Sequence, residues 1–148
     1  MCGINGFSWV DKDLIGRMNK AIEHRGPDGE GTFTGSITLG HRRLAIQDLS
    51  DKGHQPMFYS NKGACSDKHH PQLMSHSDIV IVFNGEIYNY KELRADLESR
   101  GYNFTTGTDT EVILASSLEY GSDCVKEFNG MWAFVIYDRK KYMFFMSR

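Results

Sequence analysis

Two well-marked helices, preceded and followed by β-type runs, restrict the folds open to this chain. Each helix starts at a capping box, in which Asn or Thr is followed three residues later by Glu, and each ends at a glycine. The order of strands, helices and strands favours an α+β fold of packed sheets with helices outside, rather than a doubly wound parallel sheet. The predicted helices cover residues 89–100 and 108–120, and the predicted strands cover residues 2–8, 32–46 (around a turn at 35–36), 79–83, 131–137 and 142–146.

Three further segments complete the expected layout. Apolar residues recur at helical spacing over residues 14–22, and Asp11 or Asp13 can cap the start of that helix. Residues 24–31 contain Gly-Pro and Asp-Gly pairs and are expected to form a loop. Residues 53–77 are polar and are predicted to form a long surface loop, whose two adjacent histidines are interpreted as solvated rather than metal-bound.

Composition and charge exclude several classes of protein. A chain of 148 residues suits one domain. The 17 basic and 19 acidic residues leave a net charge of −2, which does not favour binding to nucleic acid or to a membrane surface. No apolar run approaches the roughly 18 residues of a spanning helix, and the amino end lacks a basic leader, so we expect neither a membrane span nor a secretory signal.

The cysteine content predicts a reducing compartment. Three cysteines at irregular spacing do not suit a disulfide framework, and no CxxC pair occurs. The sequence therefore predicts no metal site and a cytoplasmic location. Because the chain stops directly after an apolar run, we also expect a domain that is truncated at its C-terminus.

Cys2 is the first candidate for chemistry, because a small residue after Met1 commonly leads to removal of that methionine. The mature chain would then begin with a cysteine whose α-amine has an ordinary pKa of about 7.7–8.0, so part of it is neutral at physiological pH. That amine can take the thiol proton and later give it to a leaving amine. The alternative is a small buried apolar residue, but Gly3 beside it favours close approach of a substrate.

Asn84 and Gly85 form a second candidate, at the end of a predicted buried strand. They can supply two hydrogen-bond donors, a side-chain amide and an unhindered backbone N–H. Two donors that converge at one point can form an oxyanion hole. The alternative is an ordinary β-turn with Asn-Gly at its corner, and for this motif alone the turn is favoured.

Charged residues supply two more candidates. Arg42 and Arg43 are adjacent in a strand-like segment, where alternation points one of them inward, and an inward guanidinium can clamp a carboxylate with two hydrogen bonds. A surface pair is the alternative, and it is favoured for this motif alone. Asp109 lies in the first turn of the second predicted helix and can meet an ammonium group, although its motif is at least a helix start.

Seven short segments follow one another along the chain. They are Met1–Ile4, His24–Asp28, His41–Leu44, Gly53–Met57, Asn84–Asn89, Thr108–Glu111 and Gly130–Phe134. The series resembles the glutaminase domain of class II glutamine amidotransferases over nearly the whole chain. Its combination of His-Arg-Gly-Pro-Asp with Asn-Gly-Glu-Ile-Tyr-Asn is typical of the asparagine synthetase branch.

The resemblance implies a four-layer αββα sandwich of the amino-terminal nucleophile type, which hydrolyses glutamine through a thioester. Cys2 would attack the side-chain amide, Asn84 and Gly85 would form the oxyanion hole, ammonia would leave, and water would release glutamate. Arg25 and Asp28 are expected to shape the site or the exit of ammonia. The remaining implied contacts are to the amino-acid end of glutamine: Arg43 to its carboxylate, Glu86 and Asp109 to its ammonium, and backbone groups of Leu44, Ile46 and Gln47 beside them.

The resemblance also leaves several points open. Residues 1–148 correspond to an incomplete glutaminase domain, without the synthetase domain that binds ATP and magnesium in the family, so no cofactor is expected in this chain. Aspartate is the default acceptor of the ammonia in a longer parent, but relatives that amidate other carboxylates, including sugar acids, look alike in this half. An inactive module that keeps the fold and a hydrolase of a different amide stay open as alternatives, and the oligomeric state, a homodimer included, is not determined.

Overall fold

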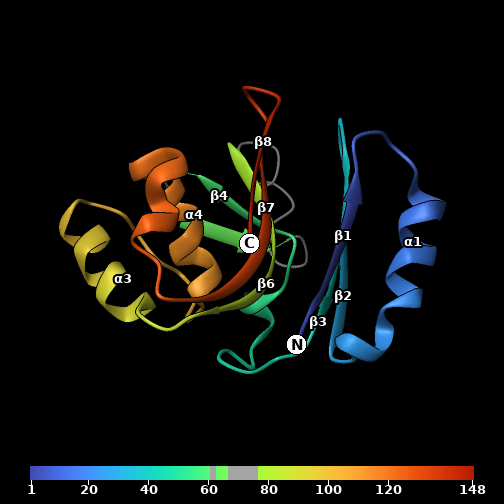
Figure 1. Cartoon of the computed structure of the whole chain (residues 1–148), viewed down its shortest axis with the longest axis horizontal. Helices are drawn as coiled ribbons and strands as arrows, with labels where there is room; N and C mark the ends of the chain where they lie inside the picture. The colour runs from blue at the N-terminus through green and yellow to red at the C-terminus, as the bar shows by residue number, and fades with distance from the viewer. Residues whose placement is uncertain (61–62, 67–76) are drawn as a thin grey trace.

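Two antiparallel sheets face each other between layers of helices in the computed structural model, which describes residues 1–60, 63–66 and 77–148 (Figure 1). The strands are β1 (Gly3–Phe7), β2 (Gly29–Thr34), β3 (Thr38–Arg43), β4 (Met57–Ser60), β5 (Gly63–Ser66), β6 (Ile79–Ile87), β7 (Gly130–Asp138) and β8 (Met143–Ser147). The helices are α1 (Lys12–Ala21), α3 (Tyr90–Ser99) and α4 (Asp109–Tyr120), with short 3-10 turns at Glu23–Arg25, Asp51–Gly53 and Gly121–Lys126. Within the described ranges, no helix is long and apolar enough to cross a membrane.

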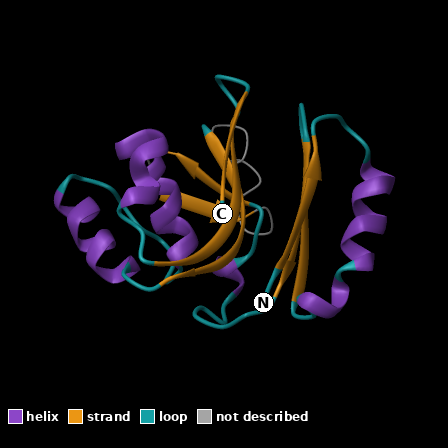
Figure 2. Cartoon of the chain, in the orientation of Figure 1, coloured by secondary structure: helices purple, strands orange, loops and turns teal. Residues whose placement is uncertain are grey.

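The layer order confirms the predicted αββα sandwich. The small sheet has the strand order β1-β3-β2, and the large sheet has the order β5-β4-β6-β7-β8. Figure 2 shows α1 outside the small sheet and α3 and α4 outside the large sheet, with the two sheets in the middle. All strand pairs are antiparallel, as expected for an α+β fold without βαβ crossovers.

The small sheet is covered on its outer face by α1. Asp11 caps this helix, because its Oδ1 accepts a hydrogen bond from the N–H of Leu14 at 2.8 Å. Ile15 and Asn19 form the buried face of α1. All six residues of β3 are buried as well, since this central strand is covered by α1 on one face and by the large sheet on the other.

The central strand of the large sheet takes part in two separate cores. Val80 and Val82 pack against apolar residues of the small sheet. Ile79, Ile81 and Phe83 point the other way and pack with the helix α4. Both faces of β6 are therefore buried, which explains why its sequence is an unbroken apolar run rather than an alternating one.

The prediction of a long surface loop over residues 53–77 is wrong for residues 63–66, which form β5, and for residues 57–60. Residues 57–60 form β4, which pairs with β5 on one side and with β6 on the other, and its first three side chains are buried. A strand of four residues inside a polar segment is too short for its period to be recognised. The two adjacent histidines of the segment lie outside the described residues.

Two other predicted boundaries also change. The strand predicted over residues 79–83 continues to Ile87, so Asn84 and Gly85 lie within β6, and the alternative of a β-turn is wrong. The loop predicted over residues 24–31 contains part of a 3-10 turn, and its last three residues belong to β2.

The two capping boxes differ in what their side chains do. Thr108 caps α4 as predicted, with its Oγ1 accepting from the N–H of Glu111 at 3.3 Å. The Glu111 carboxylate accepts from the N–H groups of Thr105 and Thr106, in the loop before the cap, and the N–H of Thr108 donates to the Oγ1 of Thr106. At α3 the predicted cap is wrong: the Asn89 side chain instead bonds the backbone of Glu127 and Asn129, both at 2.9 Å.

Candidate active site

All nine predicted site residues line one cavity of about 110 Å³. The cavity lies where the end of β3 and the loop after it approach β6 and the start of α4. The nine are Cys2, Arg43, Leu44, Ile46, Gln47, Asn84, Gly85, Glu86 and Asp109. Residues from both sheets and from four distant parts of the chain therefore share one space, while the role of each residue stays a prediction.

Cys2 lies just before β1, beside the residue that follows β3. Its Sγ is 3.4 Å from the backbone N of Leu44 and 3.6 Å from the carbonyl oxygen of the same residue. The Arg25 guanidinium donates from Nε to the Cys2 carbonyl at 3.1 Å. Asp28 accepts from the N–H of Ala45 at 2.9 Å. Arg25 therefore binds the backbone of Cys2 itself, and Asp28 binds the backbone of the segment that follows β3.

Both predicted arginines are buried, and they serve different faces of β3. Arg42 points toward α1, where its guanidinium forms ion pairs with Glu30 at 2.9 Å and Glu23 at 3.4 Å. Arg43 lines the cavity and donates to the backbone carbonyls of Ser50, at 2.9 Å, and Asp48. The expectation of a single inward arginine is therefore too narrow, because helix and sheet cover both faces of this strand.

Asn84 and Gly85 lie side by side in β6 at the wall of the cavity. Gly85 has a φ of 156°, and a Cβ added there would lie 2.2 Å from the carbonyl oxygen of Met131 on the neighbouring strand β7. Only glycine fits this position. The Oδ1 of Asn84 is buried and has no hydrogen-bond partner among the described residues.

Two carboxylates form the acidic side of the cavity. Asp109, the first residue of α4, accepts from the N–H of Ile87 at 2.9 Å. Burial raises the pKa of Asp109 to about 6, and the neighbouring charge of Glu86 adds to the rise. Glu86 accepts from the Gln47 side-chain amide at 2.9 Å. Neither carboxylate forms an ion pair within the described part of the chain, so the pair can accept a cation.

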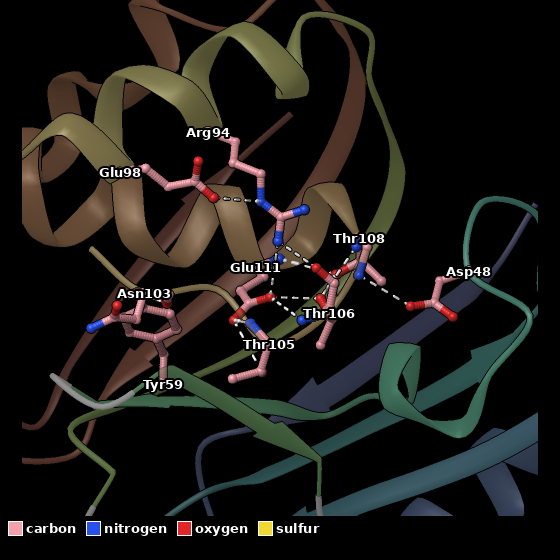
Figure 3. A network of polar contacts seen from close by, with 10 residues as sticks. Asp48, Tyr59, Arg94, Glu98, Asn103, Thr105, Thr106, Thr108 and Glu111 are labelled. Carbon is pink, nitrogen blue, oxygen red and sulfur yellow. Dashed lines mark hydrogen bonds and ion pairs between the residues drawn. The ribbon is translucent and has the colours of Figure 1, made fainter. Parts of the chain in front are cut away.

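A polar network behind the cavity was not predicted (Figure 3). The fully buried Glu111 carboxylate accepts from the N–H groups of Thr105 and Thr106, at 2.9 and 2.8 Å, and lies 3.6 Å from the Arg94 guanidinium. Asp48 accepts from the N–H of Gly107 at 3.2 Å. The loop after β3 and the loop before α4 are joined in this way. No sequence motif marks the contacts of Glu111 and Asp48 to backbone N–H groups.

Other reactive groups do not join the site. Cys124 is buried in the core under α4, and burial raises the pKa of its thiol to about 11, so it stays protonated and inert at neutral pH. The side chain of Cys65 lies outside the described part of the molecule. Among the side chains that are described, no group of three His, Cys, Asp or Glu could hold a metal ion.

Known proteins resemble this chain in sequence and in fold. The family model of a glutamine amidotransferase domain matches residues 1–148. A Methanocaldococcus jannaschii protein named as an asparagine synthetase (glutamine-hydrolysing) is 54% identical over the whole chain, which spans 30% of that relative. The asparagine synthetase B of Escherichia coli and the asparagine synthetase 3 of Bacillus subtilis are each 36% identical, and the chain spans 25% and 23% of them.

A solved structure supports the same fold. The glutamine phosphoribosylpyrophosphate amidotransferase of B. subtilis superposes with a TM-score of 0.68 at 18% identity, over 93% of this chain and 35% of that one. At this identity the likeness concerns the fold alone. The family match, which covers every residue, and the identity to the synthetases decide the family. The chain is a class II glutamine amidotransferase domain, homologous over its full length to the N-terminal domains of asparagine synthetases.

Proposed function

We propose that this domain hydrolyses glutamine to glutamate and ammonia, with Cys2 as the nucleophile. The observation that supports this most is the shared cavity, which brings a thiol, a pair of donors, an arginine and two carboxylates together. A free amino acid with a side-chain amide needs these groups: opposite charges for its two ends and two donors for its reacting carbonyl. A hydrolase of a simple amide would need neither the arginine nor the acids.

Each step of the proposed reaction has a group to perform it. Once Met1 is removed, the α-amine takes the thiol proton, and the sulfur attacks the amide carbon of glutamine. The side-chain amide of Asn84 and the backbone N–H of Gly85 stabilise the oxyanion. The amine returns its proton to the leaving nitrogen, ammonia departs, and a thioester remains. Water then attacks the thioester, which releases glutamate and restores the thiol.

The charged residues hold the substrate in place. We propose that Arg43 binds the α-carboxylate, that Glu86 and Asp109 bind the α-ammonium, and that backbone groups of Leu44, Ile46 and Gln47 complete the contact. Fixing both ends places the amide carbon beside the sulfur, and such orientation supplies a large part of an enzyme's rate.

We further propose that the ammonia serves a synthetase domain in a longer cytoplasmic protein. The chain spans 30% or less of the relatives described above, all of which are named glutamine-hydrolysing asparagine synthetases. In that protein, aspartate is the proposed acceptor, and ATP with magnesium would be bound outside residues 1–148.

The test is ammonia and glutamate release from glutamine by the wild-type chain and by the variant Cys2→Ala. Because the thioester cannot form without the sulfur, the variant should lose activity by at least about a thousandfold. Cys124→Ala is the matched control, a buried cysteine outside the cavity, and it should keep the wild-type kcat. Equal activity of wild type and Cys2→Ala would refute the nucleophile, and a correctly processed wild type without activity would favour the inactive module.

A further inference from the structure

The strand β6 extends past the end of its neighbour β4. The pairing of the two strands covers Met57–Tyr59 against Ile79–Ile81 and stops there. The residue before Met57 is Pro56, which has no N–H to offer and cannot continue the ladder. The backbone groups of β6 beyond Ile81 on this side must therefore find other partners.

Side chains take the place of the missing strand. The Oε1 of Gln55 accepts from the N–H of Phe83 at 2.7 Å. Four residues further on, Asp109 accepts from the N–H of Ile87 at 2.9 Å. In an antiparallel strand, alternate residues direct their N–H and C=O groups to the same side. Gly85 lies midway between these two positions, so its N–H is directed to the side on which the cavity lies.

Both polar atoms of the Gln55 side-chain amide form hydrogen bonds. Its Nε2 donates to the Oγ1 of Thr110 at 3.3 Å, in the first turn of α4. Gln55 is only 5% exposed and lines the cavity. The carbonyl of the same residue, Phe83, accepts from the Nε2 of His41 at 3.2 Å. Both polar backbone groups of Phe83 are thus held by side chains, directly before Asn84.

We propose that Gln55 is a positioning residue for the oxyanion hole. This inference rests on the proposed glutaminase function and deepens it. The Gln55 amide fixes the Phe83 N–H, and through it the direction of the donors at Asn84 and Gly85. It also links these donors to the start of α4, whose first residue, Asp109, faces the substrate ammonium. These hydrogen bonds thereby fix the positions of Cys2, of the oxyanion donors and of the charged residues relative to one another.

The direct test replaces Gln55 by methionine, which has a similar length and no comparable hydrogen-bonding groups. A displaced oxyanion hole weakens binding of the transition state but not of glutamine. We therefore expect kcat to fall by about 30-fold to 100-fold, with KM within about twofold of the wild type. The alkylation rate of Cys2 by iodoacetamide should stay unchanged, because substitution at this reagent forms no oxyanion.

The matched control is Asn19→Leu, which removes another buried carboxamide. Asn19 is fully buried in α1, and its Nδ2 donates to the carbonyl of Gly31 at 3.3 Å, away from the cavity. This variant should lower the melting temperature and leave kcat and KM unchanged. A loss of kcat of similar size in both variants would assign Gln55 a general structural role and overturn the proposal.

A second variant, Thr110→Val, tests the positioning role of Gln55 if Gln55→Met does not fold. It frees one end of the Gln55 amide but keeps the Phe83 contact, so kcat should fall by about threefold at unchanged KM. An unchanged kcat in Thr110→Val, or in a folded Gln55→Met, overturns the positioning role alone. A wild-type chain that releases no ammonia overturns the proposed function and this inference with it.

Discussion

The two sheets of the molecule bury side chains of opposite character. In the small sheet, the central strand β3 buries His41, Arg42 and Arg43. In the large sheet, the central strand β6 buries an unbroken apolar run over Ile79–Phe83. Burial of charge weakens a fold unless the charge is paired, whereas burial of apolar surface is the main stabilising term. The large sheet thus provides most of the apolar core, and the small sheet provides the buried Arg43 of the site.

The cavity lies where these two kinds of sheet meet. The small sheet contributes Arg43 and the segment of Cys2, while β6 contributes Asn84 and Gly85 from the stretch just beyond its apolar run. Cys2, beside the small sheet, therefore lies across the cavity from the hydrogen-bond donors of Asn84 and Gly85 on the well-packed strand β6. Changes in the large sheet should therefore reduce stability, and changes on the cavity side of the small sheet should reduce substrate binding.

The largest expected effect is on stability. Ile81 is fully buried in the large sheet, so Ile81→Ala should lower the free energy of unfolding by about 3 kcal/mol. Denaturant unfolding measures this loss, and steady-state kinetics on the folded fraction should give the wild-type KM. A tenfold rise in KM without a loss of stability would contradict the assignment of this sheet to the scaffold.

The next effect is on binding. Arg43→Lys keeps the charge but removes the planar fork that can hold a carboxylate with two bonds, so KM for glutamine should rise by about 100-fold, or about 2.7 kcal/mol. Arg42→Lys is the matched control, because that side chain faces α1 and pairs with Glu30. It should alter stability rather than KM. An analogue of glutamine without the α-carboxylate should not distinguish Arg43→Lys from wild type.

The third effect is a pH dependence of stability. Burial lowers the pKa of His41 to about 3, against an ordinary value near about 6.5. Between these values the unfolded chain binds a proton that the folded chain does not, so stability falls as the pH falls. The contribution of His41 should fall by about 2 kcal/mol between pH 7.5 and pH 5.

Unfolding free energies of wild type and His41→Met at these two pH values isolate that contribution, since all other groups are shared. The variant should show the smaller fall. Equal falls in the two proteins would mean that His41 titrates in the folded chain as it does in the unfolded chain.

The smallest effect concerns the substrate ammonium. Because burial raises the pKa of Asp109 to about 6, this carboxyl becomes neutral below that pH and no longer attracts a cation. KM for glutamine should rise by up to about tenfold for each pH unit below 6. Asp109→Asn should raise KM at pH 8 and flatten this dependence. A wild-type KM that is constant between pH 8 and pH 5 would remove Asp109 from the ammonium site.

The sequence predicts the fold class and most elements from local signals, whereas Leu44, Ile46, Gln47 and Glu86 are assigned to the site by the resemblance alone. Capping residues and apolar periods mark the helices and strands, and short motifs mark Cys2, Arg43 and Asn84. Their meeting in one cavity follows from the resemblance, since no local signal joins residues so far apart.

What the sequence does not predict depends on contacts between distant parts of the chain. Gln55 bonds a backbone N–H 28 residues away, and Asp48 bonds one 59 residues away. Backbone partners leave no trace in side-chain identity. The buried strand β4 is missed because it has only four residues and lies in a polar segment, and Asn89 binds a distant loop rather than capping its own helix.

The most direct test is the intact mass of the chain after mixing with glutamine and rapid quenching in acid. We expect a protein that has lost Met1 and that gains the mass of one γ-glutamyl group, located on Cys2 by fragmentation. The adduct should be absent in Cys2→Ala. Glutamine turnover by a chain that retains Met1, or an adduct on a different residue, would contradict the central claim that the amino-terminal thiol is the nucleophile.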